Sequence, residues 1–356
     1  MRKLIYLLLL VGHLATAGEV PAYQDRFGRA MPVVAVVGEN SGTELTDFVI
    51  PYGVLARSGA VQLLSVATKA GPLSMRPTLT LQADATTAEF DQRYPQGADY
   101  VIVPAVSRPA DTTLVAWVAA QGAKGATVVS ICDGALVVAN AGLFKGRRAT
   151  GHWATESYRK EHYPDTQWIS NTRYVADGKV ISSAGVSASM PITLALVEAI
   201  AGRERADDVA RQVGADGWST EHDSDTFRPR LGTNLSAYIA GYTNHWFHSV
   251  DNLGVAVATG VDEITLAYTA DAWSRSQRSK VYTVAASAEP LRTRSGLTIV
   301  PDRVQGAADL PELLPPLAEA TLPNKALDLA LAGVAQRYGR STAKLVALEF
   351  EYPSYH

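Results

Sequence analysis

The sequence predicts an α/β protein built on a doubly wound, mainly parallel sheet, followed by a partial, degenerate second copy of that unit. Apolar runs alternate with helical patterns between residues 33 and 202. A segment of this region recurs 218 residues later, and the only cysteine, Cys132, lies where a strand pattern gives way to a helix pattern. In a sheet of this kind, ligand sites lie at the carboxyl ends of the strands.

The first region alternates short apolar runs with amphipathic stretches. The run Val33–Val37 is apolar at every position and ends at Gly38, which is typical of a strand buried on both faces. Residues 46–57 predict a helix. Further strands are expected at 61–67, 79–82, 100–103, 127–131 and 180–182, and further helices at 112–123, 133–141 and 191–200. This alternation predicts parallel strands with helices on both faces of the sheet.

An internal repeat defines the domain organisation. Segments 66–84 and 284–302 align without a gap and share nine of their 19 residues. The repeat predicts a first unit at 33–202, a connecting segment at 203–249 and a partial second unit at 250–356. The second unit has no cysteine, and Thr265 stands opposite Asp47 of the first unit. We therefore expect it to be a structural, dimer-like partner fused to the first unit.

The N-terminal residues have the pattern of an export signal. The basic pair Arg2-Lys3 precedes an apolar run, 4–14, that is too short to span a bilayer comfortably. Ala15-Thr16-Ala17 then gives the small-x-small pattern of a cleavage site. We expect a signal peptide at 1–17 and a mature chain that begins with an extension at 18–32. The alternative is an uncleaved membrane anchor. The prediction is a periplasmic or secreted protein.

The charge of the chain argues against several kinds of partner. The chain has 32 Lys and Arg against 35 Asp and Glu, and cleavage after Ala17 would remove Arg2 and Lys3 and so change the net charge from −3 to −5. It has no cluster of basic residues and no later apolar run long enough to cross a membrane. We expect a small-molecule substrate or ligand, no nucleic acid partner and no stable membrane insertion after cleavage. A homodimer is left open.

Cys132 lies on a tight turn between a strand and a helix. This placement predicts an exposed, reactive thiol at the carboxyl edge of the sheet. The backbone N–H groups and the dipole of the helix would lower the thiol pKa and could also bind an oxyanion. The carboxylate of Asp133 would oppose the lowered pKa, but only weakly if it rotates into water. The alternative is a buried, unreactive cysteine.

Two motifs around this turn resemble a known family. The stretch Cys132–Leu143 is followed by Gly146–Trp153, which contains Thr150-Gly151-His152. In these residues the sequence resembles the ThiJ/PfpI family of the class I glutamine-amidotransferase-like superfamily. Asp47–Pro51 and Val180–Ser187 also agree with the family, and the aspartate at position 47 resembles its araC-like and isonitrile-hydratase-like branch. The resemblance covers about residues 33 to 202 and implies a flavodoxin-like sheet.

The resemblance also implies roles for individual residues. Cys132 would be the nucleophile, and Asp47 its acidic partner, which would bind the sulfur or relay a proton to substrate. His152 stands where the family often has an active-site histidine, and its role as a base or as a packing residue is left open. The residues that would line the pocket are Ser107, Asp133, Gly185 and Val186.

These residues predict a cysteine-dependent hydratase or hydrolase that acts on a small neutral electrophile. The alternative is a non-catalytic binding or redox-sensing module. Two departures from the family give it some support: Pro104–Ser107 replaces the common Gly-Gly pair, and the carboxylate of Asp133 directly follows Cys132. No cofactor and no metal are implied, and a solvated loop explains His222–Asp225 better than a metal site does. DNA binding of the kind found in some relatives is not expected, because the region after Gly202 repeats the α/β pattern.

Overall fold

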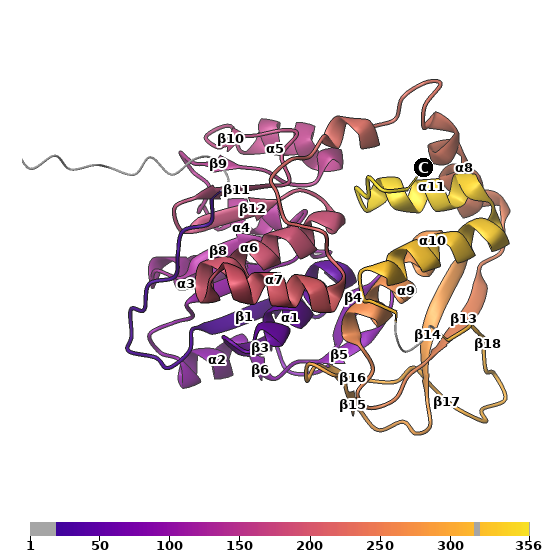
Figure 1. The fold of residues 1–356 in the computed structure, drawn as a ribbon, viewed down its shortest axis with the longest axis horizontal. Coiled ribbons are helices and arrows are strands. Elements are labelled where there is room, and N and C mark those ends of the chain that lie inside the picture. Colours follow the sequence, from indigo (N-terminus) through magenta and orange to yellow (C-terminus); the bar gives the residue numbers. More distant parts are fainter. Residues whose placement is uncertain (1–18, 317–320, 356) are drawn as a thin grey trace, which may run out of the picture.

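The computed structural model describes residues 19–316 and 321–355 (Figure 1). The predicted signal peptide, 1–17, lies outside the described residues. The first unit contains a seven-stranded sheet in the order β11-β12-β8-β7-β1-β3-β6. Only β11 in this sheet runs antiparallel to its neighbour, so the predicted doubly wound, mainly parallel sheet is confirmed. The strands are β1 (Val33–Gly38), β3 (Gln62–Ala67), β6 (Ala85–Thr86), β7 (Tyr100–Val103), β8 (Thr127–Ser130), β11 (Tyr174–Asp177) and β12 (Val180–Ser183).

Helices cover both faces of this sheet, as predicted. The strand β1 shows why, because its side chains alternate between the two faces. Val34 and Val36 belong to the apolar cluster that includes α1 and α6, whereas Val33 and Val37 belong to the cluster that includes α3 and α4. The helices are α1 (Leu45–Ser58), α2 (Thr87–Arg93), α3 (Thr112–Ala123), α4 (Gly134–Asn140), α5 (Glu156–His162), α6 (Ser189–Ala201) and α7 (Arg203–Val213). Short strands β9 (Arg148–Ala149) and β10 (Gln167–Trp168) pair beside α5.

The C-terminal unit repeats the start of the first unit. Its first elements, β13 (Asp251–Ala256), α9 (Glu263–Arg275) and β14 (Ser279–Ala285), begin within one residue of the 218-residue offset from β1, α1 and β3. The short strands β15 (Leu291–Arg292), β16 (Thr298–Ile299) and β17 (Arg303–Val304) follow at the same offset from β4 (Leu73–Arg76), β5 (Thr80–Gln82) and β6. A parallel sheet with the order β17-β14-β13-β18 results, in which β18 is Glu312–Leu313. The repeated segments thus have the same secondary structure.

Related contacts on the two sides of a pseudo-two-fold axis join the units. The strands β5 and β16 pair antiparallel and so connect β15, β16, β5, β4 and β2 (Thr43–Glu44) into one sheet, while α1 packs against α9. Arg57 binds Asp262 and Glu263, each at 2.5 Å. Arg275, which is equivalent to Arg57 at the 218-residue offset, binds Glu44, which is equivalent to Asp262. Equivalent residues of the two units therefore form ion pairs across the contact between them.

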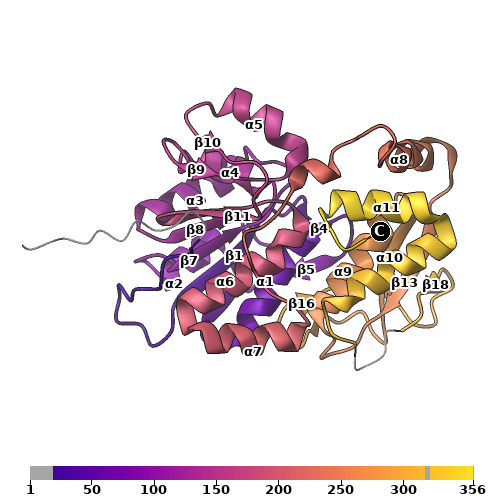
Figure 2. The ribbon, with the colours of Figure 1, turned by 45° about the horizontal axis from the view of Figure 1, so that its top comes forward.

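The last helices lead the chain back to the first unit. After α8 (Leu235–Phe247) and α10 (Lys325–Tyr338), the helix α11 (Arg340–Glu349) packs against both, and the chain then turns toward the sheet of the first unit (Figure 2). The backbone N–H of Ser187 donates to the carbonyl of Phe350 at 2.8 Å. In the described part of the chain, every helix is too short or too polar to span a bilayer.

Candidate functional site

Cys132 lies on the predicted turn between β8 and α4. Its backbone has φ of 55°, a left-handed conformation that side chains rarely adopt, and α4 begins two residues later at Gly134. Any side chain at Gly134 would collide with the carbonyl of Val103 at the end of β7. The N–H of Cys132 donates to the carbonyl of Ala184 at 3.1 Å, just after β12. The turn is therefore fixed between the carboxyl ends of β7 and β12, the two strands that flank β8.

The predicted exposure of Cys132 is wrong, because its side chain is buried with only 7% of its surface accessible. The predicted lowering of its pKa is also wrong. Burial raises the thiol pKa well above its ordinary value, and the nearby charges of Asp47, Asp133, Glu44 and Glu351 raise it further. The helix terminus does not offset burial in a site with so many carboxylates.

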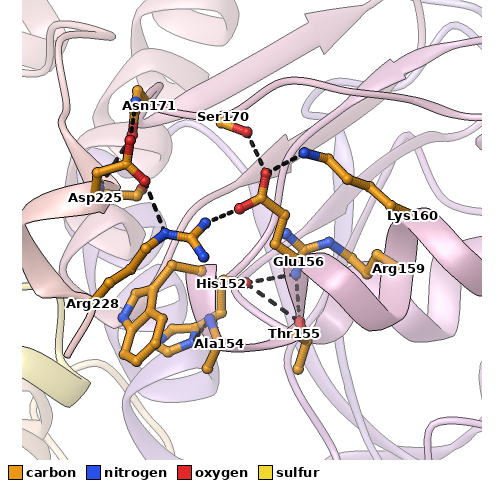
Figure 3. Close-up of polar contacts among 12 residues, drawn as sticks. His152, Ala154, Thr155, Glu156, Arg159, Lys160, Ser170, Asn171, Asp225 and Arg228 are labelled. Atoms are coloured by element: carbon orange, nitrogen blue, oxygen red, sulfur yellow. Dashed lines mark hydrogen bonds and ion pairs between the residues drawn. The ribbon is translucent and has the colours of Figure 1, made fainter.

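Asp133 does not rotate into water as expected. Its Oδ1 accepts a hydrogen bond from Thr155 Oγ1 at 2.5 Å and lies 3.6 Å from Arg159 Nη1. Figure 3 shows Thr155 and Arg159 side by side at the start of α5, beside His152. Arg159 is buried, and the same Nη1 donates to the carbonyl of His152 at 2.6 Å. The Asp133 carboxylate therefore keeps a fixed position next to Cys132.

Asp47 lies in the first turn of α1 and is completely buried. Its Oδ2 accepts a hydrogen bond from the N–H of Ala105 at 3.2 Å, whereas its Oδ1 has no partner among the described residues. Burial raises the Asp47 pKa well above its ordinary value, and the charge of Glu44 adds to this effect against the opposing charge of Arg275. Asp47 is therefore a buried carboxyl group that favours its protonated form. One of its two oxygens has no hydrogen-bond partner among the described residues.

The ring of His152 is engaged on both sides. Its Nδ1 accepts from the N–H of Ala154 at 3.2 Å, so the ring proton belongs on Nε2, which faces the carbonyl of Glu349 at 3.2 Å. His152 also precedes the 3-10 turn Trp153–Thr155 as its cap. Of the two roles left open by the sequence, this arrangement favours packing, because neither nitrogen is free to accept a proton from Cys132.

The other predicted pocket residues fall into two groups. Gly185 follows the residue that binds Cys132, and a Cβ atom there would lie 2.7 Å from the Glu351 side chain and 2.8 Å from that of His152. Val186 is buried in the core of the first unit. Ser107 is exposed, and its N–H donates to the carbonyl of Gly42 at 2.7 Å. Gly185 thus borders the site, while Val186 and Ser107 make packing and loop contacts.

Glu351 is a residue of the site that the sequence did not indicate. It follows α11, is completely buried and has φ of 52°. Its Oε2 lies 2.6 Å from His222 Nε2, and its Oε1 accepts from the N–H of Trp153 at 3.1 Å. Burial acts to raise the Glu351 pKa, but the hydrogen bond from His222 and the N–H of Trp153 outweigh it, so the pKa lies below its ordinary value. The expectation of a solvated loop at His222 is wrong, because its side chain is buried against Glu351.

The connecting segment is fastened to the first unit beside this site. Arg228 forms an ion pair with Glu156, which also accepts from Lys160 Nζ at 2.6 Å (Figure 3). Asp225 links Arg228 Nε, at 2.8 Å, to Asn171 Nδ2, at 2.9 Å. These bonds hold the segment that carries His222 against α5.

A cavity of about 970 Å³ opens on another side of the loop after β12. It lies between α6, residues 215–220 and the tail residues Tyr352–Ser354, and Cys132 is not among the residues that line it. Ser187 lines this cavity and also donates through Oγ to the carbonyl of Glu351 at 2.5 Å. The loop of residues 184–187 therefore lies between the cavity and Cys132. No group of three or more potential ligands in 19–316 and 321–355 is placed to hold a metal ion.

Comparison with known proteins identifies relatives of the first unit. The model of the DJ-1/PfpI family matches residues 33–199. An isonitrile hydratase of Pseudomonas putida is 30% identical over 174 residues, which cover 47% of this chain and 72% of that protein. The HTH-type transcriptional regulator CdhR of Pseudomonas aeruginosa is 35% identical over 105 residues, which cover 30% of this chain and 31% of the regulator. This chain thus spans only about a third of the regulator.

Two solved structures of similar proteins each cover about half of this chain. A DJ-1 superfamily protein from Salmonella typhimurium is 22% identical with a TM-score of 0.46, and the match covers 52% of this chain and 99% of that one. Drosophila melanogaster DJ-1beta is 19% identical with a TM-score of 0.47, over 52% of this chain and 98% of the other. The family match over the first unit and the isonitrile hydratase relative confirm the resemblance inferred from the sequence: the chain belongs to the DJ-1/PfpI family.

Proposed function

We propose that the chain is an exported hydratase in which Cys132 adds to a small, neutral electrophile of the isonitrile class. The observation that carries this proposal is the buried pair of Cys132 and Asp47, in which the carboxyl keeps one oxygen without a protein partner. One relative, of which 72% aligns with this chain, is an isonitrile hydratase. The signal-peptide pattern of residues 1–17 in the sequence is the reason for proposing export.

The charges around the thiol favour a neutral substrate. Four carboxyl groups, those of Asp47, Asp133, Glu44 and Glu351, lie close enough to raise the thiol pKa. An anionic substrate would be repelled by those carboxyl groups that are ionised, and its burial would cost more than that of a neutral molecule. A small isonitrile carries no net charge and needs no counter-ion.

The two groups can complete the reaction by exchanging protons. Asp47, which favours its protonated form, gives a proton to the terminal carbon of the isonitrile, while the sulfur of Cys132 bonds to that carbon and returns its own proton to Asp47. The product is a neutral thioimidate, R–N=CH–S–Cys132. Water then adds to its carbon, the C–S bond breaks, and the N-substituted formamide leaves as the thiol regains a proton. The balance is one isonitrile plus one water to one formamide.

The backbone near Asp47 favours this substrate over an amide or ester. The N–H of Ala105 is engaged by Asp47, so it is not available to bind an oxyanion. Hydrolysis of an amide or ester passes through a tetrahedral oxyanion that needs such donors. Addition of a thiol to an isonitrile forms no oxyanion, so the loss of this donor does not slow the addition step.

Hydration of cyclohexyl isocyanide to its formamide, followed by mass spectrometry, tests the proposal. We expect turnover by the wild-type protein and none by Cys132→Ala. Asp47→Asn should lower kcat by about 10² or more, which is the usual contribution of a general acid. Asp84→Asn serves as the control. This carboxylate accepts a hydrogen bond from Ser65, and the pair flanks the repeated segment. Undiminished turnover by Cys132→Ala would exclude the mechanism.

A non-catalytic binding function is the second candidate, and the cavity beside Ser187 favours it. Its volume of about 970 Å³ could hold a drug-sized ligand away from Cys132. A binder would show ligand-dependent thermal stabilisation that Cys132→Ala leaves unchanged.

A further inference from the structure

The tail of the chain meets the Cys132 site through several bonds that converge on Glu351. The Glu351 side chain accepts from the N–H of Trp153 and lies against His222, as described above. Its Oε1 is also 3.8 Å from His152 Nε2. Its carbonyl accepts from Ser187 Oγ at 2.5 Å. One residue of the C-terminal unit therefore contacts both loops of the first unit that border the site.

Both of these loops touch the turn that carries the nucleophile. The carbonyl of Ala184 accepts from the N–H of Cys132 at 3.1 Å, and Gly185 follows directly against the Glu351 side chain. On the other side, a Cβ atom at Gly151 would lie 3.1 Å from that of Ala135 in α4, so this segment lies on the helix that begins at the turn. A shift of the Glu351 side chain would therefore be transmitted to the surroundings of Cys132.

The cost of this arrangement indicates that it has a role. Glu351 is a non-glycine residue with φ of 52°, a left-handed backbone conformation that is unfavourable for a residue with a side chain. Its carboxylate is also completely buried, which is unfavourable unless several donors surround it. The bonds from His222 and Trp153 provide such donors. The fold thus retains a buried, ionised carboxylate beside the nucleophile.

We propose that Glu351 is a positioning residue supplied by the C-terminal unit, which fixes the His152–Trp153 segment and the Gly185 loop around Cys132. The second unit then completes the site, in addition to its structural contacts along α1 and α9. The inference rests on the proposed function for what the site does. The positioning role itself rests on the contacts of Glu351 alone.

Two substitutions separate the position of the side chain from its charge. Glu351→Asp keeps the charge but is one methylene shorter, so it cannot reach His222 and Trp153 together. Glu351→Gln keeps the length but removes a charge that raises the thiol pKa. Glu263→Gln is the matched control, because it weakens the buried contact with Arg57 between the units and leaves the tail untouched.

Each variant is measured in three ways: thermal unfolding by circular dichroism, the rate of iodoacetamide labelling of Cys132 against pH, and turnover of cyclohexyl isocyanide. For Glu351→Asp we expect kcat to fall about tenfold or more with little change in KM, because small misplacements of a site are costly. The pH midpoint of its labelling curve should stay unchanged, while the labelling rate of Cys132 reached at high pH should change. For Glu351→Gln the midpoint should move to lower pH. Glu263→Gln should change only the melting temperature.

The outcomes decide between the two proposals. If the wild-type protein hydrates no isonitrile but the labelling curves change as expected, the proposed function fails and the positioning role of Glu351 stands. If the wild-type protein is active and both Glu351 variants match it in turnover and labelling, the positioning role is overturned and the function stands. Failure of both variants to fold would show a purely structural role and would also overturn the inference.

Discussion

Gly185 offers a test of whether the tail fixes the site, because it has no room for a side chain. Its φ is −67°, so alanine at this position is not strained by the backbone. A Cβ atom would lie 2.7 Å from Cγ and Cδ of Glu351 and 2.8 Å from Cδ2 of His152. Gly185→Ala therefore forces the tail and the loop after β12 apart by contact alone.

The displacement follows from these distances. Ordinary van der Waals contact begins at 3.4 Å, so the Glu351 side chain must retreat by about 0.7 Å. The bond from the N–H of Trp153, now 3.1 Å, would then exceed normal hydrogen-bond length. Overpacking of this kind costs about 1–3 kcal/mol of unfolding free energy. A shift near 1 Å in a catalytic site costs about 10² in rate, so we expect kcat/KM for an isonitrile to fall by that order.

The assay compares Gly185→Ala with Gly254→Ala. Gly254 lies in β13 of the second unit, where a Cβ atom would come within 2.8 Å of Leu313. Urea unfolding should show a loss of stability in both variants, but only Gly185→Ala should lose activity. A folded Gly185→Ala protein with wild-type kcat/KM would refute the link between the tail and the site.

Two further predictions concern the interface between the units and the N-terminus. Burial, with a contribution from Glu44 and against the charge of Arg275, raises the pKa of Asp271 to about 7. The folded state then keeps a proton that the unfolded state releases near pH 4. About 4 kcal/mol of stability is therefore present at low pH and is lost as pH rises toward and through 7. Asp271→Asn should flatten the pH dependence of the unfolding free energy, measured with urea, between pH 5 and 8, and an unchanged slope would contradict this. Expression of the full chain in a Gram-negative host should give a periplasmic protein whose intact mass corresponds to a chain that starts at Gly18. Retention of residues 1–17 in the purified protein would argue for a membrane anchor.

The fold of the first unit was predictable because its patterns are local. The apolar run of β1 is buried on both faces, and its alternate valines enter two different clusters. The repeat was also predictable, since Ser65 bonds Asp84 and Thr283 bonds Asp302 in the same way in the two units. The domain boundaries stay a prediction, and α7, which begins just after the boundary at 202, packs against α6 and α1.

The site was only partly predictable because its surroundings come from distant parts of the chain. The turn at Cys132 is specified by a few adjacent residues and was found. Glu351, whose charge raises the thiol pKa, lies in the tail more than two hundred residues later, where no motif indicates it. The fixed position of Asp133 depends on Thr155 and Arg159, which the sequence connects to it in no visible way.

The pairing of β5 with β16 and of α1 with α9 has a consequence for a protein at low concentration. Two separate subunits dissociate when they are diluted, whereas two units on one chain meet in an intramolecular step whose equilibrium does not depend on protein concentration. The contacts of Arg57 and Arg275 therefore persist at any dilution. Because the single cysteine belongs to the first unit, each such intramolecular pair contains one thiol.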